Sequence, residues 1–167
     1  MALAHVDPNR RRGAVHRGIT RFLKSPPGRW FAINIAPRVD PLLLRSTGGR
    51  FALGMTLPSA LLETKGAKSG APRECPVLYF HDGADVILTA SSYGREANPS
   101  WYYNLVAHPD CVLAGEPFRA AEVTDAAESQ RLWSLADKVY AGFADYRLRA
   151  AQADRTIPQL RLSARSA

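Results

Sequence analysis

Cysteine is scarce in this chain of 167 residues, and so is every pattern that would build a metal centre. Cys75 and Cys111 form no Cys-x-x-Cys pair, and the four histidines show no ligand spacing. We therefore expect neither a disulfide framework nor a metal site, and we predict that both thiols are free and buried.

Long apolar runs are also missing. The best of them, residues 30–37, is far shorter than the roughly 20 residues that a membrane-spanning helix needs. The run Arg10-Arg11-Arg12 is superficially similar to a twin-arginine signal, but Arg17, Arg21 and Lys24 interrupt the place of its apolar segment. These absences favour a cytoplasmic protein.

Two nucleotide-binding motifs are absent as well. No Gly-x-Gly-x-x-Gly follows a predicted strand, which argues against a Rossmann site. The segment Gly66-Ala67-Lys68-Ser69 is not a Walker loop, because its Gly and Lys are not adjacent and a hairpin follows it instead of a helix.

Positive charge, in contrast, is in excess. The chain carries 22 Lys and Arg against 15 Asp and Glu, a formal net charge of +7. This excess favours nucleic acid, an anionic membrane surface, or a ligand rich in phosphate and carboxylate, and charge alone does not choose among them.

A basic amphipathic helix is predicted from Arg10 to Ser25. Its apolar residues recur at helical spacing, and its basic residues take other angles; the apolar ones are Val15, Ile19, Phe22 and Leu23. Two interpretations stay open. The helix packs on the rest of the fold or on a dimer mate with a solvated basic face, or it attaches the protein to an anionic membrane surface.

A second helix, interrupted near Pro37 and Pro41, is predicted from Arg29 to Arg45, so residues 1–45 form an N-terminal helical extension. Ser46 to Thr56 is expected to be a connection with one short strand.

Residues 46–167 carry mainly a β pattern. Strands are predicted over residues 61–64, 73–80, 85–91, 111–114, 118–123 and 157–162, and helices over 99–108, 125–141 and 143–153. Asp82-Gly83 and residues 115–117 are predicted turns, and Asp125 to Glu128 is a capping box. Hairpin-linked strands with helices set apart indicate an α+β fold around an antiparallel barrel.

The most informative part of the chain is the segment from Leu61 to Arg73. It predicts a strand, a Gly-rich basic loop and a second strand, and such a loop offers backbone N–H groups and positive charge to an anion. Further on, Asn98 is a good N-cap and Pro99 suits a first helical position, so the N–H groups of Ser100 and Trp101 should point outward. The alternative for the loop is a solvated turn whose charges serve solubility.

Five separated motifs between Leu57 and Leu162 give the chain a family resemblance. They are Glu63-Thr64-x-Gly66-x-Lys68-Ser69-Gly70-x-Pro72-Arg73, Tyr79-Phe80-x-Asp82-Gly83, Ala90-Ser91, Asn98-Pro99-x-Trp101-Tyr102-x-Asn104-Leu105 and Asp154-Arg155-Thr156-Ile157-Pro158. In this order they resemble the deazaflavin-dependent nitroreductase family, a group of split β-barrel oxidoreductases (FMN-binding-like, mostly antiparallel) that use reduced coenzyme F-420.

The resemblance implies a cofactor site in two parts. The loop residues Lys68, Ser69, Gly70 and Arg73 would hold the phosphate of the coenzyme tail. The deazaflavin ring would lie against a strand end and a helix start, in contact with Thr89, Ala90, Ser91, Ser92, Ser100, Trp101, Asn104 and Phe143.

The resemblance also implies an acceptor pocket beside the segment from Val139 to Tyr146, with Ser91, Tyr140 and Tyr146 as the catalytic candidates. Phe143 and Leu78 stand where the family prototype has tyrosines, so a quinone or an enone is a better acceptor here than a nitro compound. The implied reaction is hydride transfer from reduced coenzyme F-420 to that small acceptor.

Two other function classes stay open at this stage. One is an FMN or haem split-barrel enzyme, and the other is a non-catalytic module that binds coenzyme F-420 or a membrane surface. A homodimer and a peripheral contact with anionic membrane are compatible with the sequence, and no nucleic acid partner is expected.

Overall fold

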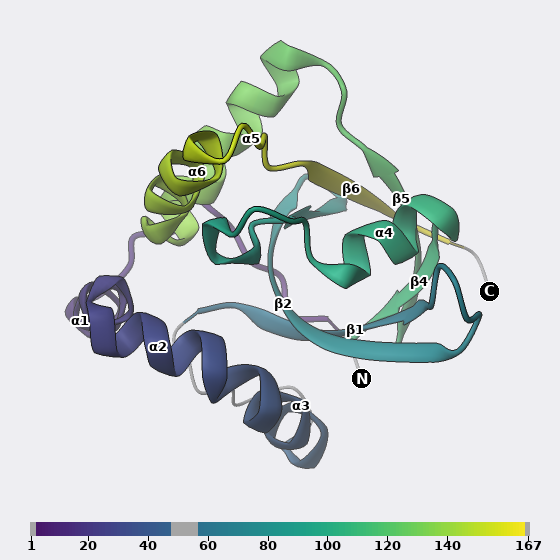
Figure 1. Cartoon of the computed structure of the whole chain (residues 1–167), viewed down its shortest axis with the longest axis horizontal. Helices are drawn as coiled ribbons and strands as arrows, with labels where there is room; N and C mark the ends of the chain where they lie inside the picture. The colour runs from purple at the N-terminus through teal and green to yellow at the C-terminus, as the bar shows by residue number, and fades with distance from the viewer. Residues whose placement is uncertain (1–2, 48–56, 166–167) are drawn as a thin grey trace.

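The structure, a computed structural model, describes residues 3–47 and 57–165, and its centre is an antiparallel β-barrel (Figure 1). The strands found in these residues close in the order β1-β2-β3-β6-β5-β4. They are β1 (Ser59–Lys65), β2 (Pro72–Asp82), β3 (Asp85–Thr89), β4 (Asp110–Leu113), β5 (Glu116–Glu122) and β6 (Gln159–Ala164). This architecture confirms the predicted α+β split β-barrel.

Two hydrophobic cores hold the barrel together. Alternation along the strands sends one set of side chains into the barrel, where Leu62, Leu88 and Leu162 are fully buried. The outer face of β3 is buried too, because Ile87 packs with Trp133 and Phe143 of the helices that cover this face. A strand buried on both faces loses the polar alternation that marks a half-buried strand.

Tight turns set the strand pairing. Asp82 pairs with Asp85 across the two-residue turn Gly83-Ala84, and Gly83 has φ +64° as such a turn requires. β4 and β5 are joined by Ala114-Gly115, with φ values of 51° and 85°. The predicted turn at residues 115–117 was therefore one residue late, because Ala114 takes a left-handed conformation that its residue type does not signal.

The N-terminal helices are α1 (Ala14–Lys24), α2 (Pro26–Asn34) and α3 (Ala36–Ser46). Ser25 accepts a hydrogen bond from the Gly28 N–H at 3.3 Å, so the two prolines that end α1 also begin α2. Pro41 lies inside α3 and the break comes at Ile35, so the predicted interruption near Pro41 is wrong. The connection from Ser46 to Thr56 lies mostly outside the described residues, and the division into 1–45 and 46–167 stays a prediction.

α1 presents a different face to the protein than its apolar spacing predicts. His16, Thr20 and Leu23 are buried, whereas Val15 is 67% exposed and Phe22 is 51% exposed. The buried side packs near α6, and Lys24 forms an ion pair of 3.1 Å with Asp145 there. The helix is therefore packed on the fold, and it leaves apolar side chains in solvent.

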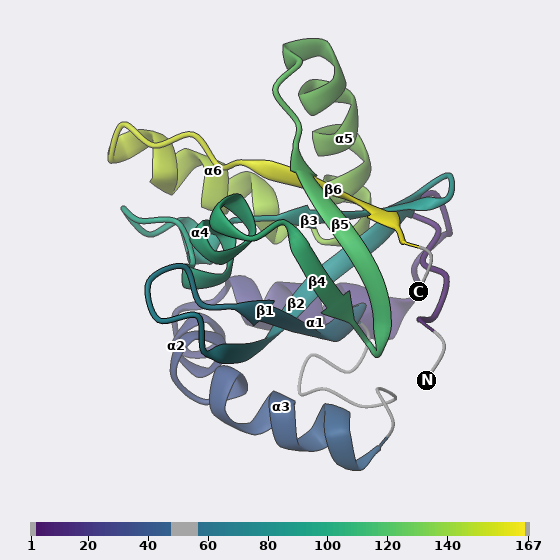
Figure 2. The same ribbon diagram turned by 90° about the vertical axis from the view of Figure 1, so that its right-hand side faces the viewer.

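The remaining helices are α4 (Ser100–Ala107), α5 (Ala126–Val139) and α6 (Gly142–Gln152), with a 3₁₀ turn η1 (Ser92–Gly94). Asp125 caps α5 by accepting from the Glu128 N–H at 2.7 Å, as the capping box predicts. Gly142 begins α6 and does not end α5, because Tyr140 is the C-cap. Figure 2 shows α5 and α6 at the upper side of the barrel, α2 and α3 below it, and α1 behind the strands. None of the described helices is long and apolar enough to cross a membrane.

Candidate functional site

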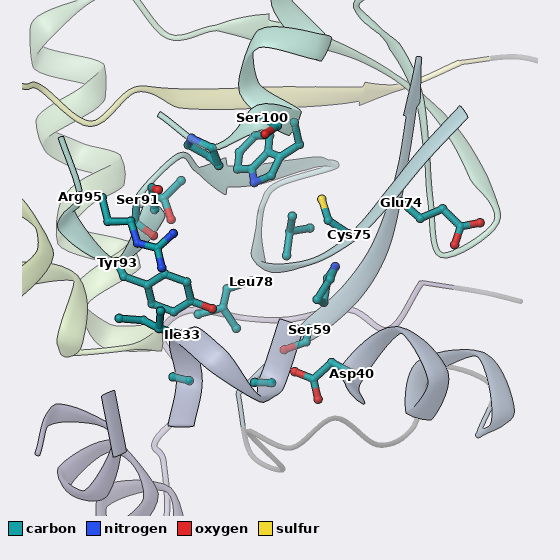
Figure 3. A pocket seen from close by; sticks show the side chains of 18 of the residues that line it. Ile33, Asp40, Ser59, Glu74, Cys75, Leu78, Ser91, Tyr93, Arg95 and Ser100 are labelled. Atoms are coloured by element: carbon teal, nitrogen blue, oxygen red, sulfur yellow. The ribbon is translucent and has the colours of Figure 1, made fainter. Parts of the chain in front are cut away.

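A cleft of about 990 Å³ opens along the edge of β2 (Figure 3). Residues 72–78 of β2 pair with β1, and residues 79–82 pair with β3, so the first half of β2 has one free edge. The cleft follows that edge, between α4 and the 89–95 segment on one side and α2 and α3 on the other. The split in the barrel thus supplies the space for a ligand.

Pro76 lies on this free edge, and its residue type alone points there, because a proline inside a strand has no N–H to donate and is found at edges or bulges. Leu61 stands opposite it in β1 and accepts from the Ala114 N–H at 3.0 Å on its other side. In an antiparallel strand the N–H and the C=O of one residue point to the same side. Both groups of Leu61 therefore point toward β4, and the Leu61–Pro76 pair carries no hydrogen bond. The proline nitrogen faces the cleft, so Pro76 costs the strand ladder no hydrogen bond, although a proline inside a strand would ordinarily remove one.

One end of the cleft is polar and positively charged. Lys68 and Arg73 line it with exposed side chains, and neither forms an ion pair with a described residue. The loop offers fewer backbone donors than predicted, because the N–H groups of Gly66, Ala67, Gly70 and Ala71 are used within the protein. Anion binding at this end therefore depends chiefly on the two cationic side chains.

Asn104 connects the loop to α4. Its Oδ1 accepts from the Ala67 N–H at 2.9 Å, and its Nδ2 donates to Thr64 Oγ1 at 3.0 Å. The side chain is buried. Asn104 lines the cleft, yet these contacts show that it holds the loop against the helix.

The start of α4 points into the middle of the cleft. Pro99 is the N-cap, and the N–H groups of Ser100 and Trp101 lie in the first turn, where a helix provides no acceptor. Asn98, the predicted cap, instead accepts from Arg155 Nε at 2.8 Å. The helix start is as expected, and its capping residue is not.

Arg155 is a residue whose role the sequence did not reveal. Its guanidinium donates to the carbonyl oxygens of Ala90, Ser91 and Arg95, in addition to Asn98. Burial lowers the pKa of Arg155. Arg155 belongs to one of the five motifs, but only the fold shows that it clamps the segment from Ala90 to Asn98.

The other end of the cleft is lined mainly by apolar side chains from elements far apart in the sequence, with the charged side chains of Arg95 and Asp40 beside them. Its walls come from α1, α2 and α3, from β2 and from α6; they include Leu23, Phe31, Ala32, Ile33, Leu78 and Phe143. Sequence reasoning missed the wall from α2 and α3, because nothing in a helix sequence tells which distant cleft it closes.

Tyr140 and Tyr146 lie at this apolar end, and their hydroxyl oxygens are 3.3 Å apart. Burial raises the pKa of both side chains. The two are therefore neutral at physiological pH, and one hydroxyl is a hydrogen-bond donor to the other.

The structure brings nearly all the predicted site residues to this one cleft. Gly70 and Ala90 do not line it: Gly70 shapes the loop with φ +67°, and Ala90 is fully buried behind the cleft. The others line it, namely Lys68, Ser69, Arg73, Thr89, Ser91, Ser92, Ser100, Trp101, Asn104, Tyr140, Phe143 and Tyr146. Their binding and catalytic roles stay predictions.

The described residues of the cleft offer neither a reactive thiolate nor a cluster of metal-binding side chains. Cys75 lines the cleft, but burial raises the pKa of its thiol to about 12, so it is not a thiolate at neutral pH. Within residues 3–47 and 57–165, no group of three or more His, Cys, Asp and Glu side chains is placed to hold a metal ion.

Comparisons with known proteins agree with this geometry. An F420H(2)-dependent quinone reductase of Mycobacterium tuberculosis is 32% identical over 108 residues, which is 60% of this chain and 72% of that protein. The solved structure of an F420-H2 dependent reductase, FDR-A, is 30% identical with a TM-score of 0.55, covering 64% of this chain and 94% of that one.

A second solved structure, described as a domain-swapped dimer, is 27% identical with a TM-score of 0.57 and covers 82% of this chain and 99% of that chain. The family model described as "F420H(2)-dependent quinone reductase" matches residues 36–162, from the start of α3 into β6. The chain therefore belongs to this quinone reductase family.

Proposed function

We propose that this protein transfers a hydride from reduced coenzyme F-420 to a quinone, and that the cleft along β2 holds both molecules. The observation that carries the proposal is the division of one cleft into a cationic end and an apolar end, with the N–H groups of α4 between them. An anionic coenzyme tail fits the first end, and a lipid-soluble acceptor fits the second.

The residues present fit the coenzyme. Lys68 and Arg73 carry charges that no described acidic residue neutralises, and the Arg73 guanidinium can bind two phosphate oxygens at once. Gly66 keeps the loop tight, because a Cβ at this position would come within 2.8 Å of Ser69 Oγ. Asn104 holds the loop in place for the tail.

The middle of the cleft fits a polar ring. The N–H groups of Ser100 and Trp101 can donate to ring carbonyl oxygens, and the helix dipole favours negative charge at that point. Arg155 fixes the facing segment that carries Ser91 and Ser92. The bound coenzyme supplies the hydride, and the protein supplies position, hydrogen-bond donors and exclusion of water.

The apolar end fits a quinone or an enone. Phe31, Ile33 and Leu78 provide apolar walls, and Ser91, Tyr140 and Tyr146 bring hydroxyl groups to the same space. Because the two tyrosines keep their protons at neutral pH, each is suited to donate a hydrogen bond and not to accept a proton. A nitro compound is the less favoured acceptor, since Leu78 and Phe143 have no hydroxyl.

Anaerobic kinetics with reduced coenzyme F-420 and menadione test this proposal. We expect oxidation of the coenzyme that depends on both enzyme and quinone, and tighter binding of F-420 than of FMN in titrations at one salt concentration. Binding of F-420 without turnover of any quinone or enone would favour the non-catalytic module, and preferential binding of FMN or haem would favour the other split-barrel class.

We also propose that α1 attaches the protein to an anionic membrane surface, where lipid-soluble quinones are found. The exposed Val15 and Phe22 lie seven residues apart, on one face of α1, and Trp30 of α2 is 61% exposed. Arg17 and Arg21 are exposed on the same helix. Apolar side chains beside basic ones are typical of helices that bind anionic lipid.

Sedimentation with phosphatidylglycerol vesicles tests the attachment. We expect wild type to sediment and the double variant Val15→Asp with Phe22→Asp to stay in solution, while Leu148→Asp, another exposed apolar residue at 68%, behaves as wild type. Equal sedimentation of all three proteins, or equal binding to phosphatidylcholine, would contradict the proposal. Deleting the helix is a poorer test, because Leu23 is part of the core.

A homodimer is a further proposal, supported by the domain-swapped dimer among the similar structures. Light scattering coupled to gel filtration tests it, and a mass equal to one chain of 18.3 kDa would contradict it.

A further inference from the structure

We infer that the hydroxyl of Tyr93, which no motif of the chain singles out, donates a hydrogen bond to the acceptor oxygen in the apolar end of the cleft. The inference rests on the proposed quinone reduction and names one more residue that touches the acceptor. It is drawn from an unusual backbone conformation, from the placement of the hydroxyl, and from the burial of the neighbouring Tyr140 and Tyr146.

The backbone at Tyr93 is in a conformation that an aromatic residue rarely takes. Ser92, Tyr93 and Gly94 have φ values of 47°, 57° and 76° in succession, so the left-handed turn carries two residues with side chains. Such strain persists only where the surroundings hold it, and it gathers at functional sites.

Contacts from α6 and from the residues before β6 hold this turn. Arg149 Nε donates to the Tyr93 carbonyl oxygen at 3.3 Å, and Arg155 binds the carbonyl groups of Ser91 and Arg95 on either side. Gly94 lies so close to α6 that a Cβ would come within 2.7 Å of the Tyr146 carbonyl oxygen. The side chain of Tyr93 is thus aimed by a braced segment.

The Tyr93 ring lies in the cleft, and its hydroxyl is available. Figure 3 shows the ring reaching from the 3₁₀ turn toward Ile33 and Leu78, with the hydroxyl at its far end. The ring meets Tyr146 edge to face at 5.9 Å, whereas the hydroxyl makes no hydrogen bond to any described residue. Tyr93 is partly exposed and lines the cleft.

Tyr140 and Tyr146 are less available than Tyr93. The hydroxyls of Tyr140 and Tyr146 contact each other, and these side chains are only 2% and 7% exposed. Leu78 and Phe143 contribute no hydroxyl. Tyr93 therefore supplies a more exposed hydroxyl donor at this end of the cleft, beside the Arg95 guanidinium that lies 5.9 Å from its ring centroid.

The protonation state suits a donor. Burial and the nearby Asp40 carboxylate raise the pKa of Tyr93 to about 12, so the hydroxyl keeps its proton at neutral pH. During the reaction the quinone gains the hydride from the reduced coenzyme and a proton from water and becomes the hydroquinone, while the coenzyme is oxidised. Tyr93 keeps its own proton, and its hydrogen bond strengthens as negative charge grows on the acceptor oxygen.

The test compares Tyr93→Phe, which keeps the ring, with Tyr102→Phe, which removes a hydroxyl that donates to Glu122 outside the cleft. With menadione we expect kcat of Tyr93→Phe to fall about tenfold, KM to change less, and F-420 affinity to stay within about twofold of wild type. Tyr102→Phe should match wild type. A kcat for Tyr93→Phe within twofold of wild type would overturn the inference.

Calorimetric binding of menadione to the protein loaded with oxidised F-420 separates this inference from the proposed function. We expect Tyr93→Phe to bind the quinone several-fold more weakly than wild type and Tyr102→Phe to bind it equally. If wild type binds menadione but reduces no quinone, the proposed function is wrong, and the affinity difference still decides the role of Tyr93. Equal affinity in all three proteins contradicts it.

Discussion

The two ends of the cleft are built in different ways. The cationic end comes from one hairpin loop and the nearby start of α4, all within residues 64–104. The apolar end gathers side chains from α1, α2, α3, β2 and α6, which span more than a hundred residues of sequence. We infer that substitutions can change the acceptor while the coenzyme end is kept.

The largest effect is expected at the cationic end. Replacing both Lys68 and Arg73 by Ala should weaken F-420 binding by roughly 2 to 5 kcal/mol in sum, which is less than twice the about 1.5 to 3 kcal/mol of one charge-assisted bond because both side chains are exposed to solvent. Turnover at saturating coenzyme should change little. Fluorescence titration and steady-state kinetics measure the two quantities.

The matched control is Arg17→Ala with Arg21→Ala, which removes the same charge from α1, away from the cleft lining. This control should bind F-420 as wild type does. If the Lys68 and Arg73 double variant binds F-420 normally but turns over slowly, the loop lies near the reacting atoms. That result would contradict the proposed division of the cleft.

Arg155→Ala should affect both ends at once, because Arg155 clamps the segment that carries Ser91 and Tyr93. Loss of its charge-assisted hydrogen bonds should lower the free energy of unfolding by about 2 to 4 kcal/mol, and F-420 affinity and quinone turnover should both fall. Urea denaturation and kinetics measure these changes. The control, Arg119→Ala, removes an exposed ion pair and should lower the free energy of unfolding by under about 1 kcal/mol. Equal losses of unfolding free energy in the two variants would show that Arg155 does not clamp the segment.

Ala32→Phe should act on the apolar end alone. Ala32 lines the cleft from α2, so a larger side chain there should exclude part of the acceptor and raise KM for menadione by about tenfold, or about 1.4 kcal/mol. F-420 affinity should not change. Ala127→Phe, on the exposed face of α5, is the control; weaker F-420 binding in Ala32→Phe would mean that the coenzyme extends into this end.

Phe143→Tyr should have the smallest effect. It restores a hydroxyl where the family prototype has one, beside Tyr140 and Tyr146, and should raise activity toward nitro compounds relative to quinones by a few-fold. Phe143 is only 2% exposed, so the new hydroxyl must share the space of the tyrosine pair. An unchanged ratio of nitro to quinone turnover would contradict this prediction.

The sequence predicted those features that rest on local patterns. The Asp82-Gly83 hairpin, the capping box at Asp125 and the basic loop before Arg73 each depend on residues a few positions apart, and the structure contains them. The free edge of β2 could be foreseen because Pro76 has no N–H to pair.

Features that rest on long-range packing were missed. Spacing predicts that Val15 and Phe22 of α1 face inward, but both are exposed and His16 and Thr20 are buried instead. Arg155 lies some 60 residues from the carbonyl groups that it binds, and Tyr93 takes a conformation that its residue type disfavours. No local rule connects these residues to the cleft, so only the folded chain could show their placement.

The most direct test of the divided cleft measures the affinity of the wild-type protein for F-420 and for menadione at low and high salt. If charge holds the coenzyme and apolar contact holds the acceptor, raising NaCl from about 0.05 M to about 0.5 M should weaken F-420 binding several-fold, because salt screens exposed charges. Menadione affinity should stay constant or rise slightly. Salt-independent F-420 binding, or parallel weakening of both ligands, would contradict the account.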